Sequence, residues 1–405
     1  MRAVVVGAGI GGLAAAVGLQ QAGADVVVLE RAAELRPVGA GLSIFGNGLA
    51  ALDALGLGSR LRADGCAPAD QGLTAGQRRP DGRWITVTPA SALEELRAVH
   101  RAELQDLLLG ALQPGTVCCG VEVQAVAGAA GTVTVRTSGQ ECDRVDVVVA
   151  ADGLRSRVRS AWPQDPGVRY AGYTAWRGVT EGPVDLAGAA GETWGRGLRF
   201  GVVPLRDGRV YWFAVASLPA GLHLPDEHAE VRRLFGGWHR PIPALVEATP
   251  PAAVLRHDVH DLAGPLPTFV RGGCVLLGDA AHAMTPDLGQ GGNLALEDGV
   301  TLARLLAGLA RQDQPDQQAL EAALERYDRL RRGRTQAIAR QARLLGRVAQ
   351  ARGPLAVLRD GVLHRVPPSL VAARLTTVQS WRPPALAPGG ATAVTGAASD
   401  RPPRH

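Results

Sequence analysis

Two glycine-rich segments, far apart in the chain, carry residue types that bind phosphate and hydroxyl groups. The first, GAGIGG, places Gly7, Gly9 and Gly12 at G-x-G-x-x-G spacing. The second, LLGDAAHAMTPDLGQGGN at 276–293, combines an aspartate, a proline and three closely spaced glycines. Glycines allow a tight turn and let the backbone N–H groups of a helix N-terminus approach a phosphate. Both segments therefore predict contact with a phosphate-bearing ligand.

The elements around the first segment favour a dinucleotide. Residues 2–6 are predicted as a strand, 13–22 as a helix and 25–30 as a second buried parallel strand that ends at Glu30. An acid at this offset from the glycines hydrogen-bonds ribose hydroxyls. The alternative is that the glycines only allow close helix–sheet packing. This segment alone does not separate NAD from FAD.

The second segment favours FAD, whose ribityl chain and isoalloxazine need contacts of their own. Asp279 follows a predicted buried strand and is placed to accept ribityl hydroxyls. Gly289, Gly291 and Gly292 let backbone amides approach the flavin, and a helix predicted from about Leu294 points its N-terminus there. One FAD molecule bridging both segments explains why the chain has two.

These motifs resemble those of the class A flavoprotein monooxygenases, the family of p-hydroxybenzoate and salicylate hydroxylases. The segment ADGLRSRVR (151–159) resembles the family's Asp-Gly motif, and GAGLSIFGNGLAALDALGL (39–57) and HRAELQDLL (100–108) also fall where the family has them. The resemblance spans residues 2–345 and implies FAD, NAD(P)H and O2, with oxygen carried as a C4a-hydroperoxyflavin. The expected cofactor-binding residues are Gly7, Gly9, Ile10, Gly11, Gly12, Glu30, Arg31, Ser43, Arg101, Val123, Asp152, Gly153, Arg159, Asp279, Gly289, Gln290, Gly291, Gly292 and Asn293.

A nicotinamide cofactor is expected to bind without a second Rossmann unit. GRGLRFG (195–201) has glycines but no following helix and is predicted as strand or turn. In the family the Asp-Gly segment serves both FAD and NAD(P)H, which makes Asp152 and Arg159 candidates. A salt-bridge role remains the alternative for Arg159. The sequence has no G-x-S-x-G, no H-E-x-x-H and no clustered metal ligands, so no metal site is predicted.

Four residues are candidates for catalysis or substrate binding. Pro286 is expected to stiffen the loop beside the flavin, with its carbonyl facing substrate, and His282 is either an acid or a polar residue that fills the loop. Strand alternation places Arg199 on one face of 198–203, where it and Tyr211 are expected to bind a planar, anionic substrate. This stretch most resembles bacterial FAD-dependent urate hydroxylases, in which a matching Arg and Tyr contact substrate. The same two residues are equally explicable as a cap on the sheet.

The predicted architecture is α/β: a Rossmann-like FAD-binding domain (GR2-type) with an inserted antiparallel β-sheet substrate domain and C-terminal helices. Alternation at 83–88 and the Pro-, Gly- and aromatic-rich strands after 165 indicate the insertion. The expected boundaries are 1–69, 99–164 and 272–350 for FAD binding, 70–98 and 165–271 for substrate, 351–382 for helices, and 383–405 for a disordered tail.

Composition narrows the class further. With 405 residues, 46% of them hydrophobic, the chain is long enough for two domains without disulfides, and its five cysteines include no C-x-x-C pair. A cytoplasmic protein without a membrane span and without a nucleic-acid partner is expected, either a monomer or a homodimer. The net charge of +5 comes from arginine alone. The arginine-rich run 326–347 is interpreted as the solvated face of a long helix, with a partner surface as the alternative.

The sequence therefore predicts an FAD-dependent NAD(P)H:oxygen monooxygenase that hydroxylates a small aromatic or heteroaromatic substrate. Three alternatives stay open: epoxidation by the same chemistry, a flavin-dependent reductase that transfers hydride without oxygen, and a flavin-binding protein without catalysis. A flavin-dependent halogenase is disfavoured because the G-W-x-W-x-I-P signature is absent.

Overall fold

A six-stranded, largely parallel sheet forms the centre of the first half of the molecule. The computed structural model describes residues 1–35, 41–65, 72–139, 141–222 and 224–385. The strand order is β17 (Val270–Arg271), β18 (Cys274–Leu276), β11 (Val147–Ala150), β1 (Arg2–Val6), β2 (Asp25–Glu30) and β7 (Val117–Cys119). Only β17 pairs antiparallel, with β18. The central strands read as continuous valine runs because both faces of the sheet are covered.

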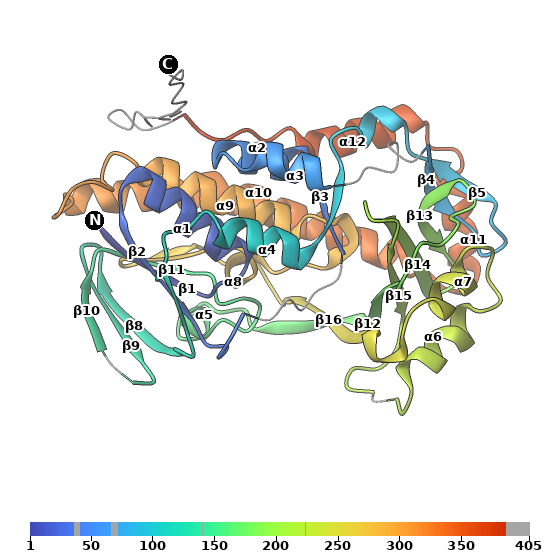
Figure 1. Cartoon of the computed structure of the whole chain (residues 1–405), viewed down its shortest axis with the longest axis horizontal. Coiled ribbons are helices and arrows are strands. Elements are labelled where there is room, and N and C mark those ends of the chain that lie inside the picture. Colours follow the sequence, from blue (N-terminus) through green and yellow to red (C-terminus); the bar gives the residue numbers. More distant parts are fainter. Residues whose placement is uncertain (36–40, 66–71, 140, 223, 386–405) are drawn as a thin grey trace, which may run out of the picture.

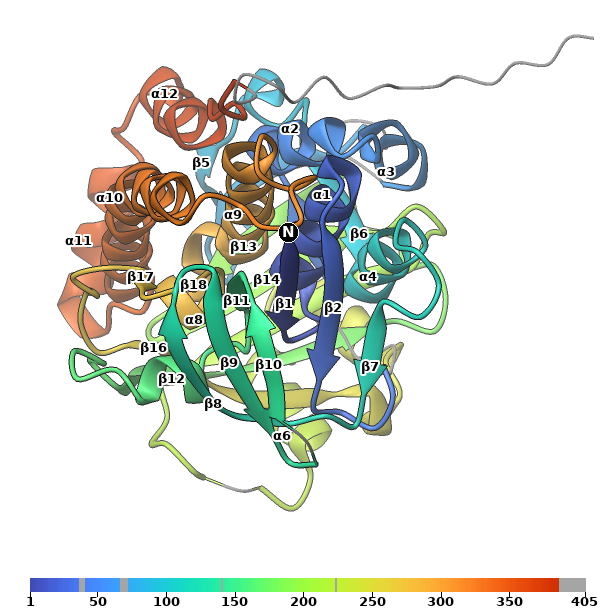
Figure 2. The same ribbon diagram turned by 90° about the vertical axis from the view of Figure 1, so that its left-hand side faces the viewer.

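Helices cover one face of this sheet and a small sheet covers the other. Figure 2 shows four helices side by side, α10 (Gln317–Ala349), α9 (Gly291–Leu306), α1 (Ile10–Ala22) and α4 (Arg101–Leu109). Helices α1 and α9 approach so closely that a Cβ on Gly18 would lie 2.6 Å from the Cβ of Ala303. The opposite face carries the three-stranded sheet of β8 (Val123–Ala129), β9 (Thr132–Thr137) and β10 (Glu141–Val145).

A seven-stranded sheet forms the second half of the molecule (Figure 1). Its order is β16 (Leu255–Leu262), β12 (Val168–Val179), β15 (Val210–Ala216), β14 (Leu198–Pro204), β13 (Ala189–Trp194), β4 (Thr74–Arg78) and β5 (Trp84–Val87). Neighbours are antiparallel except β13 and β4. Trp176, Phe200 and Trp212 are buried on its outer face beneath α6 (Glu227–Phe235) and α7 (Ile242–Glu247), so both tryptophans belong to the core.

The remaining elements connect these layers. They are the two-stranded sheet of β3 (Gly41–Ile44) and β6 (Arg97–His100), and α2 (Gly46–Ala54), α3 (Gly58–Asp64), α5 (Arg157–Ser160), α8 (Asp279–His282), α11 (Gly353–Leu363), α12 (Pro368–Gln379) and the short 3-10 helices η2 (Ala90–Ala92), η3 (Pro251–Ala253) and η4 (Pro286–Leu288).

The α/β class with sheets and C-terminal helices is confirmed, and two details differ from the sequence predictions. Helices α6 and α7 lie within a stretch described from sequence only by its strands. Helix α9 begins at Gly291 rather than near Leu294, because Gly291 and Gly292 already adopt helical conformation. Most of the predicted tail, 386–405, lies outside the described residues.

Candidate active site

The N-terminal glycines divide into two that allow packing and one that faces open space. Gly7 has a φ of +102°, and a Cβ there would lie 2.6 Å from the carbonyl oxygen of Ala151. A Cβ on Gly12 would lie 2.1 Å from the carbonyl oxygen of Gly7. A Cβ on Gly9, by contrast, would meet no described atom within 4 Å. Gly9 also precedes the first turn of α1, whose amides receive no side-chain cap from the described chain. This end of α1 therefore offers free N–H groups to an anion.

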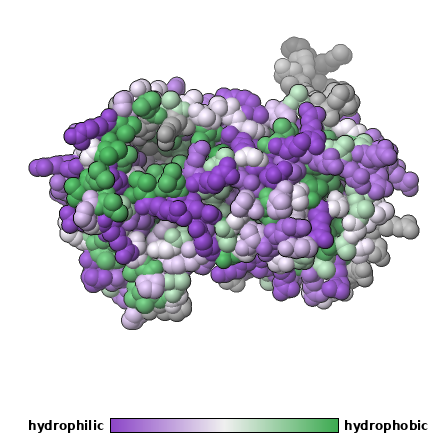
Figure 3. Space-filling view, turned by 180° about the vertical axis from the view of Figure 1, so that it is seen from behind, coloured by the Kyte–Doolittle hydropathy of each residue, from purple (hydrophilic) through white to green (hydrophobic). Residues whose placement is uncertain are grey.

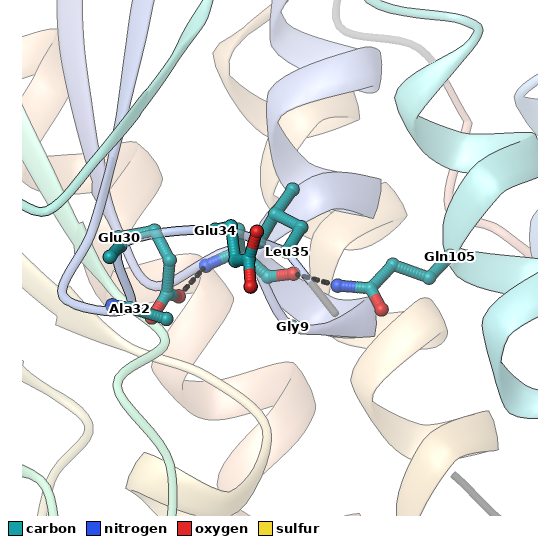
Figure 4. A pocket seen from close by; sticks show the side chains of 8 residues that line it. Gly9, Glu30, Ala32, Glu34, Leu35 and Gln105 are labelled. Carbon is teal, nitrogen blue, oxygen red and sulfur yellow. Dashed lines mark hydrogen bonds between the residues drawn. The ribbon is translucent and has the colours of Figure 1, made fainter. Parts of the chain in front are cut away.

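A cavity of about 450 Å³ opens beside Gly9, where the sequence predicts a bound nucleotide. Figure 4 shows Glu30, Glu34, Leu35 and Gln105 around it. The carboxylate of Glu30 accepts the backbone N–H of Ala8 at 2.8 Å and that of Ala32 at 2.9 Å. Each carboxylate oxygen keeps a further acceptor position. The cavity thus has a fixed acid on its wall, and the predicted contact of Glu30 with a ribose stays a prediction.

Four other residues predicted to bind cofactor do not line this cavity. Ile10 and Gly11 are buried in the first turn of α1, and a Cβ on Gly11 would lie 2.8 Å from Leu277. Arg31 is exposed just after β2. Val123 is buried at the start of β8. Gly11 therefore allows close packing of the helix. For Ile10, Arg31 and Val123, contact with the cofactor stays a prediction.

Asp279 and His282 sit on the short helix α8 but in opposite environments. Gly278, with a φ of +57°, turns the chain from β18 into α8 so that the Asp279 side chain is exposed. His282 is buried, and its Nε2 lies 2.6 Å from Oδ2 of Asp298. His282 is thus enclosed and paired within the protein, which favours the alternative that it fills the loop. Its role as an acid stays a prediction.

Two side chains of the loop of 286–293, those of Gln290 and Asn293, hold it in place. Asn293 accepts the N–H of Phe45 and donates to the carbonyl oxygens of Ser43 and Gly289, each at 2.9–3.0 Å. Gln290 accepts from the amide of Asn47 at 2.9 Å. These contacts fix the N-terminus of α9, which has no side-chain cap within the described residues. The side chains of Gln290 and Asn293 are thus engaged within the protein, and the carbonyl oxygen of Ser43 accepts from Asn293. The cofactor contacts predicted for these three residues stay predictions.

Behind this loop lies a buried network of ion pairs that links α9 to α10. Glu297 accepts from Arg331 at 2.6 Å and from Arg334 at 2.8 Å, and Asp298 accepts from Arg331 at 2.6 Å. Burial alone would raise the pKa of Asp298, but the neighbouring His282 and Arg331 lower it overall. Asp298 is therefore held charged inside the protein, and both acids have at least one arginine partner.

The Asp-Gly segment holds two candidates for nucleotide binding, Asp152 and Arg159, and only Asp152 has a buried acceptor atom without a partner in the described chain. One carboxylate oxygen of Asp152 accepts the N–H of Val158 at 3.3 Å, and the other is buried without a hydrogen-bond partner in the described chain. A Cβ on Gly153 would meet open space. Arg159 is buried and donates to Asp165 and to the carbonyls of Leu154 and Ala280. These three bonds favour the salt-bridge alternative for Arg159, and its predicted contact with a nucleotide stays a prediction.

The inner face of the seven-stranded sheet contacts residues 278–293, here called the Gly-Asp loop, through Arg199. Its guanidinium donates to Asp287 at 2.6 Å and to Gln350 at 3.2 Å, and lies 3.6 Å from Glu192. The hydroxyl of Tyr173 donates to the other oxygen of Asp287 at 2.6 Å. Burial, followed by the charge of Asp287, raises the pKa of Tyr173, so this phenol stays protonated. These bonds bring sheet and loop together at the place where the sequence predicts the flavin ring.

Tyr211 lies on the same face and toward α4. Tyr211 lies opposite Val203 on the neighbouring strand, and Arg199 lies opposite Val215. Because Arg199 and Val203 are four residues apart on one strand, all of these side chains lie on one face of the sheet. Burial raises the pKa of Tyr211, and Arg177 beside its hydroxyl opposes this shift. Burial also lowers the pKa of His257 on the same face, with further contributions from Arg177 and then Arg101. Arg101 thus lies at this end of the sheet, exposed at the start of α4.

Pro286 begins η4 and is exposed. Its carbonyl oxygen accepts the N–H of Gly289 at 2.9 Å, and Gly289 itself has a φ of +63°. The proline and the left-handed glycine therefore fix the loop, as the sequence predicts for Pro286. Whether its carbonyl also faces a substrate stays a prediction.

The residues present fit FAD. Uncapped helix N-termini at α1 and α9, open space beside Gly9, Gly153 and Gly291, and the orphaned oxygen of Asp152 are features that an extended, phosphate-bearing ligand satisfies. Sequence reasoning missed Tyr173 and Asp287 as partners of Arg199. The signal for the ion network was present, because Glu297 and Asp298 are adjacent acids inside an otherwise apolar helix.

Comparison with known proteins gives consistent matches. The family model described as FAD binding domain matches residues 1–342. The aurachin C monooxygenase/isomerase of Stigmatella aurantiaca is 40% identical over 339 residues, covering 82% of this chain and 85% of that protein. The FAD-dependent urate hydroxylase of Klebsiella pneumoniae is 36% identical over 342 residues, covering 82% and 87%. The crystal structure of Klebsiella pneumoniae HpxO complexed with FAD and uric acid has a TM-score of 0.82 and 32% identity, covering 94% and 97%.

Proposed function

Because the chain belongs to the family of FAD-dependent monooxygenases and hydroxylases, we propose that it uses NAD(P)H and O2 to hydroxylate a planar nitrogen heteroaromatic molecule. The resemblance found in the sequence is thereby confirmed at the level of the family. The observation that carries the proposal is the bond between Arg199 and Asp287, because it sets a polar sheet face against the Gly-Asp loop. A ring held by that loop has the sheet face directly beside it.

In this proposal FAD spans the two glycine-rich segments. Glu30 and the amides after Gly9 hold the adenosine and phosphate end, and Asp279 and the backbone of 289–292 hold the ribityl chain and ring. Bound FAD supplies the redox chemistry, in which NAD(P)H is oxidised and one atom of O2 enters the substrate while the other leaves as water. The protein contributes orientation and the exclusion of water.

The substrate class follows from the groups on the sheet face. Two carboxylates lie beside Arg199, so its charge is largely balanced, and recognition by hydrogen bonds is favoured over pairing with a simple anion. Tyr211 and Tyr173 add hydroxyl groups to this face, beside apolar side chains such as Phe213 and Val215. A ring with nitrogen and carbonyl groups at its edge, of which uric acid in HpxO is an example, suits this arrangement.

Oxygen uptake tests the proposed reaction. A panel of purines, quinolones, aromatic acids and polyketide phenols is added to purified protein with NADH or NADPH. A monooxygenase consumes oxygen together with the nicotinamide when its substrate is present, and the product gains one oxygen atom. Nicotinamide oxidation without oxygen uptake, matched by a reduced product, identifies the reductase alternative. Bound FAD without substrate-stimulated turnover identifies the binding protein.

Asp279→Ala is expected to yield protein that is folded but largely free of FAD. Its exposed carboxylate sits beside an open helix end and accepts the ribityl hydroxyls in the proposed arrangement. The ratio of visible flavin absorbance to protein absorbance measures the loss. Asp313→Ala removes another exposed carboxylate and is expected to keep its flavin. Full flavin retention by Asp279→Ala contradicts the placement of this site.

Tyr211→Phe is expected to raise KM by about threefold to tenfold with little change in kcat, as loss of one substrate hydrogen bond does. The ring remains to pack against Gly41. Tyr170→Phe is the matched control, because the Tyr170 hydroxyl donates to the carbonyl of Leu218 instead. An unchanged KM in Tyr211→Phe shows that this tyrosine only caps the sheet.

A further inference from the structure

Helix α11 carries its apolar side chains outward and its charged side chains inward. Every exposed residue of the helix is apolar or glycine, namely Gly353, Pro354, Leu355, Val357, Leu358 and Val362. Leu355 is 66% exposed and Leu358 63% exposed. A surface helix of a globular protein normally turns its polar side outward. The reversed orientation therefore marks a surface that meets something other than water.

The inward charges are fully engaged, so the orientation of α11 is fixed by the fold. Arg359 is buried and donates to the carbonyl oxygens of Ala349 and Gly195, at 2.7 and 3.1 Å. Asp360 lies 2.8 Å from Arg359 and 3.3 Å from Arg79. Rotating the helix to hide its leucines would expose these bonds to solvent and break them.

The neighbouring helices extend the same surface. Leu344 and Val348 form an exposed strip in the last turns of α10, and Leu370 is exposed on α12. Most exposed large apolar side chains among the described residues lie in this part of the chain. Figure 3 shows apolar residues gathered at the left end of the molecule, the end that α11 occupies. We call this the α11 surface, comprising Leu344, Val348, Leu355, Val357, Leu358, Val362 and Leu370.

The exposed charges along the chain from Leu344 to Leu370 are of one sign. Arg347, Arg352 and Arg365 are exposed at the margins of the α11 surface. Between Leu344 and Leu370 the only acid is Asp360, which faces inward. Exposed leucines and valines flanked by arginines match the acyl boundary and the anionic headgroups of a bilayer. We propose that the α11 surface docks the protein on an anionic lipid bilayer.

This docking is peripheral, since no helix among the described residues is long and apolar enough to span a membrane. A second copy of the chain is a poorer occupant, because a two-fold contact through α11 would set the arginine margin of one copy against that of the other. A bilayer containing anionic lipid supplies the opposite charge. The arginine-rich run, of which Arg347 is the last member, would then serve partly as a partner surface.

Co-sedimentation of the full-length, FAD-loaded protein with vesicles tests the proposal. The protein is expected to sediment with vesicles of phosphatidylcholine and phosphatidylglycerol, and much less with phosphatidylcholine alone or at high salt. Leu355→Ser combined with Leu358→Ser is expected to weaken the partition by at least about tenfold. Leu330→Ser combined with Leu222→Ser removes two exposed leucines elsewhere and is expected to leave it unchanged.

Two double variants, each with two arginines replaced by glutamine, test the electrostatic part of the proposal independently. Arg347→Gln combined with Arg365→Gln is expected to weaken binding to the anionic vesicles about tenfold. Arg326→Gln combined with Arg329→Gln, on an exposed part of α10 distant in sequence, is the control. Equal melting temperatures establish that all variants are folded. No sedimentation with either vesicle, an equal loss in the control variants, or a dimer abolished by the leucine substitutions overturns the proposal.

Discussion

Gly9→Val is expected to give a folded protein that does not bind FAD, whereas Gly12→Val is expected not to fold stably. The two glycines lie in the same loop but face different surroundings. A side chain on Gly9 enters open space beside the nucleotide cavity, and its φ of −74° suits any residue. A side chain on Gly12 collides with the carbonyl oxygen of Gly7 at 2.1 Å. The first change therefore occupies the phosphate position, and the second separates α1 from β1.

Circular dichroism, melting temperature and flavin content measure these effects together. Gly56→Val is a suitable control, because Gly56 also faces open space but lies at the end of α2; its φ of +75° predicts modest destabilisation with FAD retained. If Gly9→Val binds FAD normally, the phosphate does not lie at this helix end. If Gly12→Val folds with an unchanged melting temperature, the glycine is not required for packing.

Arg331→Met is expected to lower the free energy of unfolding by about 3–5 kcal/mol. Arg331 is buried and bonds to Glu297 and Asp298, each at 2.6 Å. Methionine fills a similar space but leaves two buried carboxylates with less compensation. Because Asp298 also accepts the N–H of Gly278 and lies against His282, the damage should reach the Gly-Asp loop. Urea unfolding with and without FAD measures both effects.

Arg334→Met is the matched comparison. Its guanidinium bonds to the same Glu297 but is 23% exposed, and Glu297 keeps Arg331 when Arg334 is lost. We expect a loss of roughly 1 kcal/mol, nearer to that of a partly exposed pair. Equal effects of the two substitutions contradict the assignment of Arg331 as the centre of the network.

The nucleotide-binding half of the site was predictable because its signals are local. The turn at Gly7–Gly12 and the acid at Glu30 depend on residues that are close in sequence, and the structure places both beside one cavity. Asp279 and the glycines after Pro286 could be placed similarly, since each follows directly from a strand end or a helix start. When a strand, a turn and a helix follow one another directly, the relative positions of residues close in sequence can be predicted.

The roles of His282 and Arg159 could not be predicted in this way, because their partners are distant or contributed by backbone. Asp298, on another helix, binds His282, and the carbonyl of Ala280, 121 residues away, accepts from Arg159. The bond between Arg199 and Asp287 likewise depends on how two sheets meet. Residue type alone does not distinguish a buried, satisfied group from one that faces a ligand.

In the proposed arrangement, the bonds of Asp287 to Arg199 and Tyr173 join the loop that holds the flavin to the sheet face that holds the substrate. A ligand that orders this loop then also shapes the neighbouring pocket. If flavin raises the affinity for substrate in this way, thermodynamic reciprocity requires substrate to raise the affinity for flavin by the same factor. An empty apoprotein would then be a poor receptor for the aromatic molecule, and the protein would seldom sequester a compound that it is not equipped to transform.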